Sequence, residues 1–600
     1  MIKNNSKFKM KQSDVLHPIV EFVIGGGITF ISALFCMWLC QFSCGVSLTE
    51  INAKSAFILY ISLYASIFAF ATIISGRICL GNSISMIFLF VVTVLDYQVY
   101  SFRGTEILPG DVKSIRTALG VAEQYHPQIT INLVTSLILL IFYLVMLQIL
   151  IKFRKGLYWR VISLAVLFGS IIVFTQFIDN VPLIVYGNEG MKQNSFPVNF
   201  CRLMYGSTVD KPEGYSVEIV DELEDTYCTE SDIQKRPVII AIMNESFADF
   251  SVVGDVPVNG ELLSFFNSIK ENTIKGWTQV PVFGAGTANT EWEFLTGHSM
   301  HFLPAGSTPY SNNGLTDSYA SIVSNLKNIG YHCVAMHPYY EYSYTRNTVY
   351  PRMGFDDILF LQDFPQEKLL REYVSDQEMY EEIIHQYETY TDDAPLFIFG
   401  VTMQNHGGYE YEGDNYTKTV ELQNMSQEYP KAEQYLSLLK ESDAALKYLI
   451  QYFQDVEEDV VIAFFGDHLP AIEEEFYKEI AGAKTSEQLQ LDLHKVPFFV
   501  WANYDIEEQH VENTSVNYLT NYIYDVAQIP KPGYNRFLEE LQKSIPVFAT
   551  NKVYSQSEKK YVDYDALSDK EAKLIQQYNY LVYNAVYDVE NRSEMFKGAE

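Results

Sequence analysis

The stretch Val-Val-Ile-Ala-Phe-Phe-Gly-Asp-His (460–468) indicates the fold of the last two thirds of this 600-residue chain. Its first six residues form a continuous apolar run, which is typical of a strand buried on both faces of an α/β sandwich. Similar runs occur at 238–243, 396–401 and 496–501, with helical stretches between them. The pattern therefore predicts an α/β domain over residues 236–550.

Polar side chains follow three of these four apolar runs. Glu245 follows the first run, His406 follows the second, and Asp467 and His468 follow the third. In open α/β sheets, ligands bind beyond the carboxyl ends of the strands. We therefore expect a functional site at this edge of the sheet.

A glycine-bracketed turn, Phe-Gly-Ala-Gly-Thr-Ala-Asn-Thr-Glu (283–291), presents Thr287. Together with Glu245, Asp467 and His468 it offers two carboxylates, one imidazole and one hydroxyl, a set that suits Mn²⁺ or Mg²⁺ and also accommodates Zn²⁺. A metal ion can activate a threonine hydroxyl and neutralise charge on a phosphoryl oxygen. Taken alone, each of these residues is more often a turn, a cap or a buried hydrogen-bonded group, so the prediction depends on the whole set.

The first third of the chain is predicted to be an all-α transmembrane domain, residues 1–179. A spanning helix needs about 20 mostly apolar residues. Five segments qualify: 17–40, 56–75, 80–99, 129–151 and 159–178. The first is too long for a signal peptide and lacks a small-residue cleavage site, so we interpret it as an anchor.

The basic residues predict the orientation of this domain. They cluster before the first span, between the second and third, and between the fourth and fifth: Lys3, Lys7, Lys9, Lys11, Arg77, Lys152, Arg154, Lys155 and Arg160. These sites share one side of a five-span protein, so everything after Asp179 is expected on the outer side. The loop 101–128 is also expected outside, lying on the bilayer surface. The prediction is a multi-pass cell-membrane protein with an extracellular catalytic domain.

Two further segments complete the domain prediction. Residues 180–235 mix Pro, Gly, Asn and acidic residues with little periodicity, which indicates a linker. Residues 551–600 are predicted to be a helical tail in which Ser568 and Glu571 form a capping box.

Composition limits the class of partner. The formal net charge is −32, and a nucleic-acid-binding protein needs a basic face, so no nucleic acid is expected. The seven cysteines show no CxxC and no metal-finger spacing, so no disulfide framework is predicted for the outer domain. This cysteine usage fits a single-membrane bacterium better than an oxidising periplasm.

Four motifs in order carry a family resemblance: Asn-Glu-Ser-Phe (244–247), Gly-Thr-Ala-Asn-Thr-Glu (286–291), Asn-His (405–406) and Gly-Asp-His (466–468). The chain resembles the lipoteichoic acid synthase family, whose members have five spans followed by a sulfatase-like domain of the alkaline phosphatase superfamily. The resemblance implies that Glu245, Thr287, Asp467 and His468 hold Mn²⁺ and that Thr287 is the nucleophile.

The same resemblance implies the substrate contacts. Phosphate contacts fall on Arg346, His337 and His406, and Tyr344 stands where the family has a tryptophan two places before the arginine. This exchange affects the expected binding of glycerol. From the sequence alone, Arg346 and His337 would be read as exposed surface residues.

The implied reaction transfers phosphoglycerol from phosphatidylglycerol to an acceptor hydroxyl through a covalent intermediate on Thr287. The acceptor remains open between a glycerophosphate polymer such as lipoteichoic acid, a glycolipid and a wall glycan. One alternative is a phosphoethanolamine transferase, although such enzymes usually carry several paired cysteines and more zinc ligands. A sulfatase-like phosphodiesterase or hydrolase is a second alternative, although no C/S-x-P-x-R sequence lies near Thr287. A third is an inactive sensor or scaffold, which the intact set of four site residues disfavours.

Overall fold

The structure is a computed structural model. It describes residues 18–50, 54–112, 127–150, 157–185, 187, 189–207, 209–229, 233, 235–311, 318–365, 368–550 and 552–597. The chain divides into two compact units. The first comprises Met1–Ser101 and Pro127–Tyr205, and the second comprises Phe102–His126 and Gly206–Glu600.

The first unit contains five long apolar helices, each long enough to cross a membrane. They are α1 (Pro18–Ser43), α2 (Lys54–Ser75), α3 (Ile78–Arg103), α5 (Ile131–Leu150) and α6 (Leu157–Phe177). The predicted five-span bundle is confirmed. His17, the expected first residue of the first span, lies outside the described residues.

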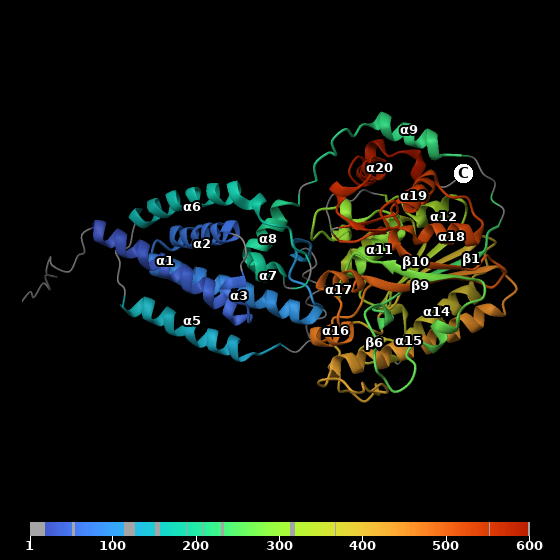
Figure 1. The fold of residues 1–600 in the computed structure, drawn as a ribbon, viewed down its shortest axis with the longest axis horizontal. Coiled ribbons are helices and arrows are strands. Elements are labelled where there is room, and N and C mark those ends of the chain that lie inside the picture. Colours follow the sequence, from blue (N-terminus) through green and yellow to red (C-terminus); the bar gives the residue numbers. More distant parts are fainter. Residues whose placement is uncertain are drawn as a thin grey trace, which may run out of the picture. The chain divides into compact units, whose positions relative to one another are not determined.

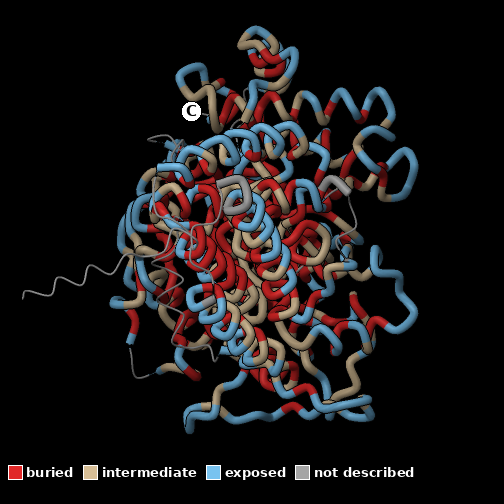
Figure 2. The backbone as a smooth tube through the Cα atoms, turned by 90° about the vertical axis from the view of Figure 1, so that its left-hand side faces the viewer, coloured by how far each residue is buried: buried red, intermediate tan, exposed pale blue. Residues whose placement is uncertain are grey.

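The bundle helices keep apolar side chains on their outer surfaces. Phe88, Phe142 and Phe168 are each more than half exposed, and exposed positions recur along the helices in Figure 2. Helices α2 and α3 approach closely, since a Cβ added at Gly81 would lie 2.4 Å from Thr72 Oγ1. Apolar outer faces and small residues at helix contacts are what a lipid environment favours.

The segment 180–235 differs from the predicted linker. It contains α7 (Glu189–Asn194) and α8 (Phe196–Tyr205) in the first unit and α9 (Val217–Tyr227) in the second. Asn194 and Asn199 are both nearly fully buried, and the Asn194 amide donates to Asn199 Oδ1 at 3.1 Å. Short helices held by such polar contacts leave little hydrophobic periodicity for sequence analysis to detect.

The second unit is built on an eight-stranded sheet in the order β10-β2-β9-β8-β1-β7-β3-β4. The strands are β1 (Val238–Asn244), β2 (Thr273–Gln279), β3 (His332–Met336), β4 (Asp357–Leu359), β7 (Leu396–Val401), β8 (Val460–Gly466), β9 (Lys495–Ala502) and β10 (Gln509–Ser515). Within this sheet β9 runs antiparallel to both of its neighbours, and the other described pairings are parallel.

The four strands predicted from apolar runs are β1, β7, β8 and β9, and all four are confirmed. Strand β1 lies between β7 and β8, with Ile239 opposite both Phe397 and Val461. Since these three strands are parallel, their carboxyl ends meet at one edge of the sheet.

Helices cover both faces of the sheet, as Figure 1 shows. Helices α14 (Asp376–Thr389) and α15 (Pro430–Gln454) lie on one face, and α11 (Thr287–Thr296), α12 (Ile322–Asn328) and α18 (Leu519–Ala527) lie on the other. The shorter helices of this unit are α10 (Ser264–Ser268), α13 (Arg346–Met353), α16 (Glu474–Ala481) and α17 (Ser486–Asp492). The arrangement confirms the predicted α/β class.

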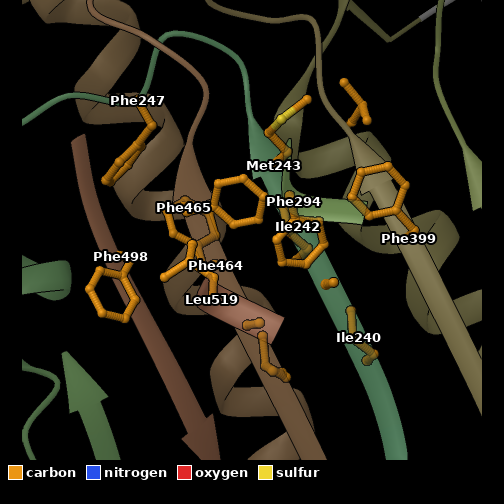
Figure 3. Close-up of a cluster of buried hydrophobic side chains, with 14 of the residues drawn as sticks. Ile240, Ile242, Met243, Phe247, Phe294, Phe399, Phe464, Phe465, Phe498 and Leu519 are labelled. Atoms are coloured by element: carbon orange, nitrogen blue, oxygen red, sulfur yellow. The ribbon is translucent and has the colours of Figure 1, made fainter. Parts of the chain in front are cut away.

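The core fixes α11 against the sheet. The Phe294 ring of α11 lies 4.5 Å from the ring of Phe465 on β8 and 5.8 Å from that of Phe399 on β7 (Figure 3). All three side chains are fully buried. Burying a phenylalanine contributes about 1.5–3 kcal/mol, so this contact holds the helix that begins at Thr287 over the strand ends.

The C-terminal part packs on the far end of the same helix. It comprises α19 (Gly533–Ser544), β11 (Val547–Phe548), β12 (Val553–Ser555), β13 (Lys560–Val562) and α20 (Asp569–Val586). The predicted capping box is confirmed, since Ser568 and Glu571 bond reciprocally at the start of α20. The Tyr578 hydroxyl donates to Gly297 O at 2.7 Å, directly after the end of α11.

Candidate metal and phosphoryl-transfer site

The ends of β1 and β8 place two carboxylates side by side. Ser246, directly after Glu245, has a φ of 51° in the left-handed region, which is uncommon for a residue other than glycine. Its backbone N–H donates to Asp467 Oδ1 at 2.7 Å, and its hydroxyl donates to Glu245 Oε1 at 3.0 Å. The strained residue therefore holds Glu245 and Asp467 in one cluster.

Glu245, Asp467 and His468 form a buried group with metal-ligand spacing. Each offers one ligand atom, and these atoms all lie within 4.8 Å of one another. No other group of three His, Cys, Asp or Glu residues within the described ranges has this arrangement. Asp467 Oδ2 and His468 Nε2 are buried without a hydrogen-bond partner, although they lie 3.2 Å apart. Buried polar atoms are normally satisfied, so these two atoms indicate an absent ligand.

The electrostatics of the cluster also fit a cation. Burial raises the pKa of Glu245 well above its usual value, and the nearby Asp467 raises it further. His468 Nδ1 lies 3.0 Å from Leu469 O, and a proton on Nδ1 leaves the Nε2 lone pair for a metal. A divalent ion would offset the repulsion between the two buried carboxylates.

Thr287 begins helix α11 beside this cluster. Gly286, the residue before it, has a φ of 95°, which favours glycine. The Thr287 hydroxyl lies 3.4 Å from Glu245 Oε2, and the residue is 8% exposed. The structure therefore brings all four predicted metal-site residues together at a helix N-terminus, which favours an anionic group.

Thr290 lies in the same helix but faces a different partner. It is completely buried, and its hydroxyl donates to Asp467 O at 2.8 Å. Its oxygen is therefore engaged in holding α11 to the end of β8, whereas Thr287 faces the metal ligands.

A second segment, residues 102–112, packs on the turn that presents Thr287. We call residues 283–287 the Thr287 turn. The segment 102–112 is the described part of the loop between the third and fourth spans, and it belongs to the second unit. A Cβ added at Gly284 would lie 2.5 Å from Arg103 O, and one added at Gly110 would lie 2.8 Å from Thr308 Oγ1. The Arg103 guanidinium forms a bidentate pair with Asp111, which closes the segment on itself.

This packing differs from the expectation that the loop lies on the bilayer surface. The described residues instead contact the Thr287 turn and residues 306–308. Backbone contacts at glycines carry little sequence signal, which explains why the prediction missed them. Residues 113–126 lie outside the described part of the chain.

Arg346 is not an exposed surface residue. It is 1% exposed and forms a buried ion pair with Glu291, with 2.7 Å between Nη2 and Oε2. Its Nη1 lies 3.2 Å from His337 Nε2, and His337 Nδ1 lies 3.1 Å from Val401 O. Burial and the neighbouring Arg346 lower the pKa of His337 well below its usual value, so this histidine is neutral.

The chain reaches Arg346 through a strained turn. Tyr344 and Thr345 have φ values of 50° and 57°. The Arg346 guanidinium carbon lies 5.3 Å from the centroid of the Tyr344 ring, within cation–π range. Two successive left-handed residues persist only where their surroundings impose them, which is common beside functional sites.

His406 lies at the end of β7, as predicted. Its Nδ1 is 2.9 Å from the Tyr373 hydroxyl. Burial, together with the neighbouring Arg371 and His468, lowers the pKa of His406 to about 3. The imidazole follows β7, which lies next to β1 at the edge of the sheet that carries Glu245.

Sequence analysis missed several residues that support the site. Glu291 lies in the same motif as Thr287, one helical turn later, which was a usable signal. Asn244 precedes Glu245 and donates to Asp376 Oδ2 at 2.8 Å, and Ser442 donates to the same oxygen at 2.6 Å. Asp376 and Ser442 lie far away in sequence, so only the fold reveals this buried network.

Comparison with known proteins supports the fold of the second unit. Residues 237–529 match the family model described as Sulfatase. These residues are similar to the sulfatase family, and the predicted combination of a five-span bundle with a sulfatase-like domain of the alkaline phosphatase superfamily is confirmed. The family resemblance proposed from the four motifs is confirmed with it.

Two curated relatives come from Rhizobium meliloti (strain 1021). A putative cyclic beta-1,2-glucan modification protein is 27% identical over 396 residues, which cover 63% of this chain and 60% of that protein. The capsular polysaccharide biosynthesis protein RkpI is 28% identical over 247 residues, which cover 40% of this chain and 42% of that protein. The chain thus matches about half the length of these relatives.

Two solved structures share the fold. The Streptococcus pyogenes phosphoglycerol transferase GacH, in complex with sn-glycerol-1-phosphate, has a TM-score of 0.52 and 20% identity. The match covers 65% of this chain and 100% of that one. The integral membrane protein lipooligosaccharide phosphoethanolamine transferase A (EptA) from Neisseria meningitidis has a TM-score of 0.50 and 12% identity, and covers 83% of this chain and 95% of its own. At such identities the likeness concerns the fold.

Proposed function

We propose that this multi-pass sulfatase-family protein transfers phosphoglycerol from phosphatidylglycerol to an acceptor hydroxyl, with Thr287 as the nucleophile. The observation that carries the proposal is the position of the Thr287 hydroxyl. It lies 3.4 Å from Glu245 at the start of α11, beside the partnerless atoms of Asp467 and His468. A phosphorus atom held there would meet a hydroxyl, a cation site and a helix N-terminus together.

Glu245, Thr287, Asp467 and His468 would hold the metal ion, and we propose Mn²⁺, with Mg²⁺ or Zn²⁺ as alternatives. When bound, the ion would lower the pKa of the threonine hydroxyl and neutralise charge on a phosphoryl oxygen. The donor set fits this role because the carboxylates are buried together and two ligand atoms lack any hydrogen-bond partner.

The reaction would proceed as two displacements at phosphorus. In the first, Thr287 Oγ1 loses its proton and bonds to phosphorus, and the bond to the diacylglycerol oxygen breaks while that oxygen gains a proton. In the second, an acceptor hydroxyl loses its proton and bonds to phosphorus, and the Thr287 oxygen leaves and regains a proton. The threonine ends unchanged, and the phosphoglycerol group has moved between two alcohols.

The remaining predicted residues are proposed as substrate contacts. His337 and His406 are neutral imidazoles, suited to hydrogen bonds with phosphoryl or glycerol oxygens. Arg346 would act through Nη1, the nitrogen that faces His337 and not Glu291. Tyr344 would contact the glycerol group with its ring.

The comparisons support the proposed class of enzyme, a phosphotransferase. The GacH structure contains sn-glycerol-1-phosphate, which is the kind of group proposed to be transferred here. EptA is a phosphoethanolamine transferase, so ethanolamine is the alternative head group. The proposed location of the catalytic domain is the outer side of the cell membrane, where it would face the lipid donor and a polymer, glycolipid or glycan acceptor.

The experiment that tests the proposal is trapping of the covalent intermediate. Purified full-length protein is incubated with phosphatidylglycerol and Mn²⁺ without acceptor, and the tryptic peptide 276–327 is fragmented by mass spectrometry. We expect a phosphoglycerol adduct on Thr287. The Thr287→Ala variant should lose at least about 10³-fold in transfer, since no oxygen remains to hold phosphorus. The Thr287→Ser variant should keep partial activity, since it retains the hydroxyl but loses the rotamer restriction.

Thr290 is the internal control because it shares the peptide and the residue type. An adduct on Thr290, or an active Thr287→Ala protein, would refute the nucleophile assignment. If phosphatidylethanolamine is supplied together with phosphatidylglycerol and the adduct carries ethanolamine, the mechanism would stand and the donor would be phosphatidylethanolamine.

A further inference from the structure

Four tyrosines crowd into six positions beside the proposed site: Tyr339, Tyr340, Tyr342 and Tyr344. The rings of Tyr340 and Tyr342 are nearly parallel, with centroids 5.2 Å apart and 9° between their planes. Tyr340 is 40% exposed. Single exposed aromatic residues are ordinary on protein surfaces, but a parallel pair of rings, one exposed and one half-buried, beside a candidate active site requires an explanation.

The backbone that carries this pair is held in one conformation. Ser343 N donates to Tyr340 O at 2.9 Å, Thr345 N donates to Tyr342 O at 3.0 Å, and Asn347 N donates to Glu341 O at 3.0 Å. The left-handed residues Tyr344 and Thr345 end the turn. Because the rings are prearranged, a partner that stacks on them need not order the segment first.

The pair connects to the site through one further ring. Tyr339 lies 4.9 Å from Tyr340 and stacks with His406 at 6.5 Å and 18°. His406 follows β7, the strand that lies beside β1 and its Glu245. A ligand on the tyrosine pair is thus separated from the metal-ligand cluster by a short row of aromatic rings.

The charge around the pair selects among the three acceptor classes. Glu341, between the two tyrosines, is exposed, and residues 337–345 contain no lysine or arginine. Three arginines of the described residues make contacts within the protein: Arg346 pairs with Glu291, Arg103 pairs with Asp111, and the Arg371 Nη2 donates to the carbonyls of Gln404 and His406. A glycerophosphate polymer carries one negative charge per unit, and residues 337–345 offer it no lysine or arginine.

We propose that Tyr340 and Tyr342 form an acceptor platform that stacks against an uncharged sugar ring, so that the acceptor is a neutral glycan. The face of an aromatic ring is electron-rich and attracts the positively polarised C–H groups on the apolar face of a pyranose. This inference rests on the proposed transfer function and specifies its acceptor.

The test measures how the phosphoglycerol group is partitioned. Full-length protein receives short-chain phosphatidylglycerol with Mn²⁺, together with neutral gluco-oligosaccharides or a short glycerophosphate oligomer, and transfer is compared with hydrolysis. For Tyr340→Ala we expect the ratio of transfer onto oligosaccharide to hydrolysis to fall at least about fivefold, since one aromatic contact is lost. Tyr340→Phe should stay within about twofold of the unchanged protein, because stacking needs the ring and not the hydroxyl.

Tyr448 is the matched control, since it is 42% exposed and lies on α15. Tyr448→Ala should leave the ratio unchanged. The proposal is overturned if Tyr340→Ala leaves the ratio unchanged, or if the protein cleaves donor but accepts only the glycerophosphate oligomer. It is also overturned if Tyr340→Ala weakens activity only when the donor is embedded in vesicles, because the rings would then contact the bilayer.

Saccharide binding separates this inference from the proposed function. Saturation-transfer NMR with the oligosaccharides reports contact with the tyrosine pair even when no phosphoglycerol is moved. Loss of the Thr287 adduct with intact Tyr340-dependent binding would contradict the function alone, and an intact adduct without such binding would contradict the platform alone.

Discussion

At the scale of single residues, the contrast between Asp467 and other buried aspartates shows what a metal ligand requires. Asp467 is completely buried, and one of its oxygens has no hydrogen-bond partner. Asp443 is also buried, but its two oxygens accept from Phe265 N at 2.8 Å and Phe266 N at 2.7 Å. Backbone N–H groups thus bind both carboxylate oxygens of Asp443, whereas one carboxylate oxygen of Asp467 has no hydrogen-bond partner.

This contrast predicts how metal content responds to substitution. Asp467→Asn removes one negative charge from the cluster and should lower bound Mn²⁺ in the purified protein at least about tenfold, with a similar loss of donor cleavage. Asp443→Asn is the control and should lower thermal stability while retaining metal. The measurement is metal content by mass spectrometry after dialysis. Full metal content in Asp467→Asn would mean that the ion binds elsewhere.

At the scale of elements, the sequence predicted those strands whose signal is local. β1, β7 and β8 are continuous apolar runs and were all recognised, and with them the edge that carries Glu245, His406 and Asp467. β10 (Gln-His-Val-Glu-Asn-Thr-Ser) is mostly polar and was missed, because an edge strand needs little burial. β2 (Thr-Ile-Lys-Gly-Trp-Thr-Gln) lies between β10 and β9 and was missed because its residues form no continuous apolar run. The antiparallel direction of β9 depends on chain connections and cannot be derived from its own residues.

The same limit applies to the site. Glu245, Thr287, Asp467 and His468 each lie beside a strand end or a glycine turn, which are local patterns. The pair between Arg346 and Glu291 joins residues 55 positions apart, and the contact of residues 102–112 with the Thr287 turn joins segments even further apart. Neither contact can be predicted from the sequence, because each depends on three-dimensional packing.

The packing of residues 102–112 against residues 306–308 leads to a testable prediction. A Cβ at Gly110 would lie 2.8 Å from Thr308 Oγ1 and 3.0 Å from Thr308 N, so Gly110→Ala should push this segment away from residues 306–308. We expect donor cleavage to fall several-fold, about fivefold, because a shift of about 1 Å near a reacting group is costly. Thr308→Ala removes the nearest atom and should restore part of the activity in the double variant.

The control for this prediction is another glycine with free space around it. Nothing lies within 4 Å of a Cβ placed at Gly169, so Gly169→Ala makes the same chemical change without a clash. If Gly110→Ala cleaves the donor as fast as Gly169→Ala, the packing of residues 102–112 on the rest of the second unit does not contribute to catalysis.

At the scale of the whole molecule, the number of membrane helices is the feature that decides where catalysis takes place. Five helices in the described part of the chain are long and apolar enough to span a bilayer, and an odd number places the two ends of the bundle on opposite sides. Basic residues favour the cytoplasmic side, and they cluster before the first helix, at Arg77 and between the fourth and fifth helices. The domain after the last helix should therefore be extracellular.

Protease digestion tests this topology directly. With an N-terminal epitope tag and a second tag after residue 600, protease added to intact protoplasts should remove the C-terminal tag and the outer domain, and the N-terminal tag should remain protected until lysis. Replacing Arg77 and the basic residues at 152–160 with glutamine should weaken this preference, since loop lysines and arginines set orientation. Protection of the outer domain in intact protoplasts, with digestion only after lysis, would place catalysis in the cytoplasm. That outcome would exclude an extracellular glycan as the acceptor, because the nucleophile and the glycan would then lie on opposite sides of the membrane.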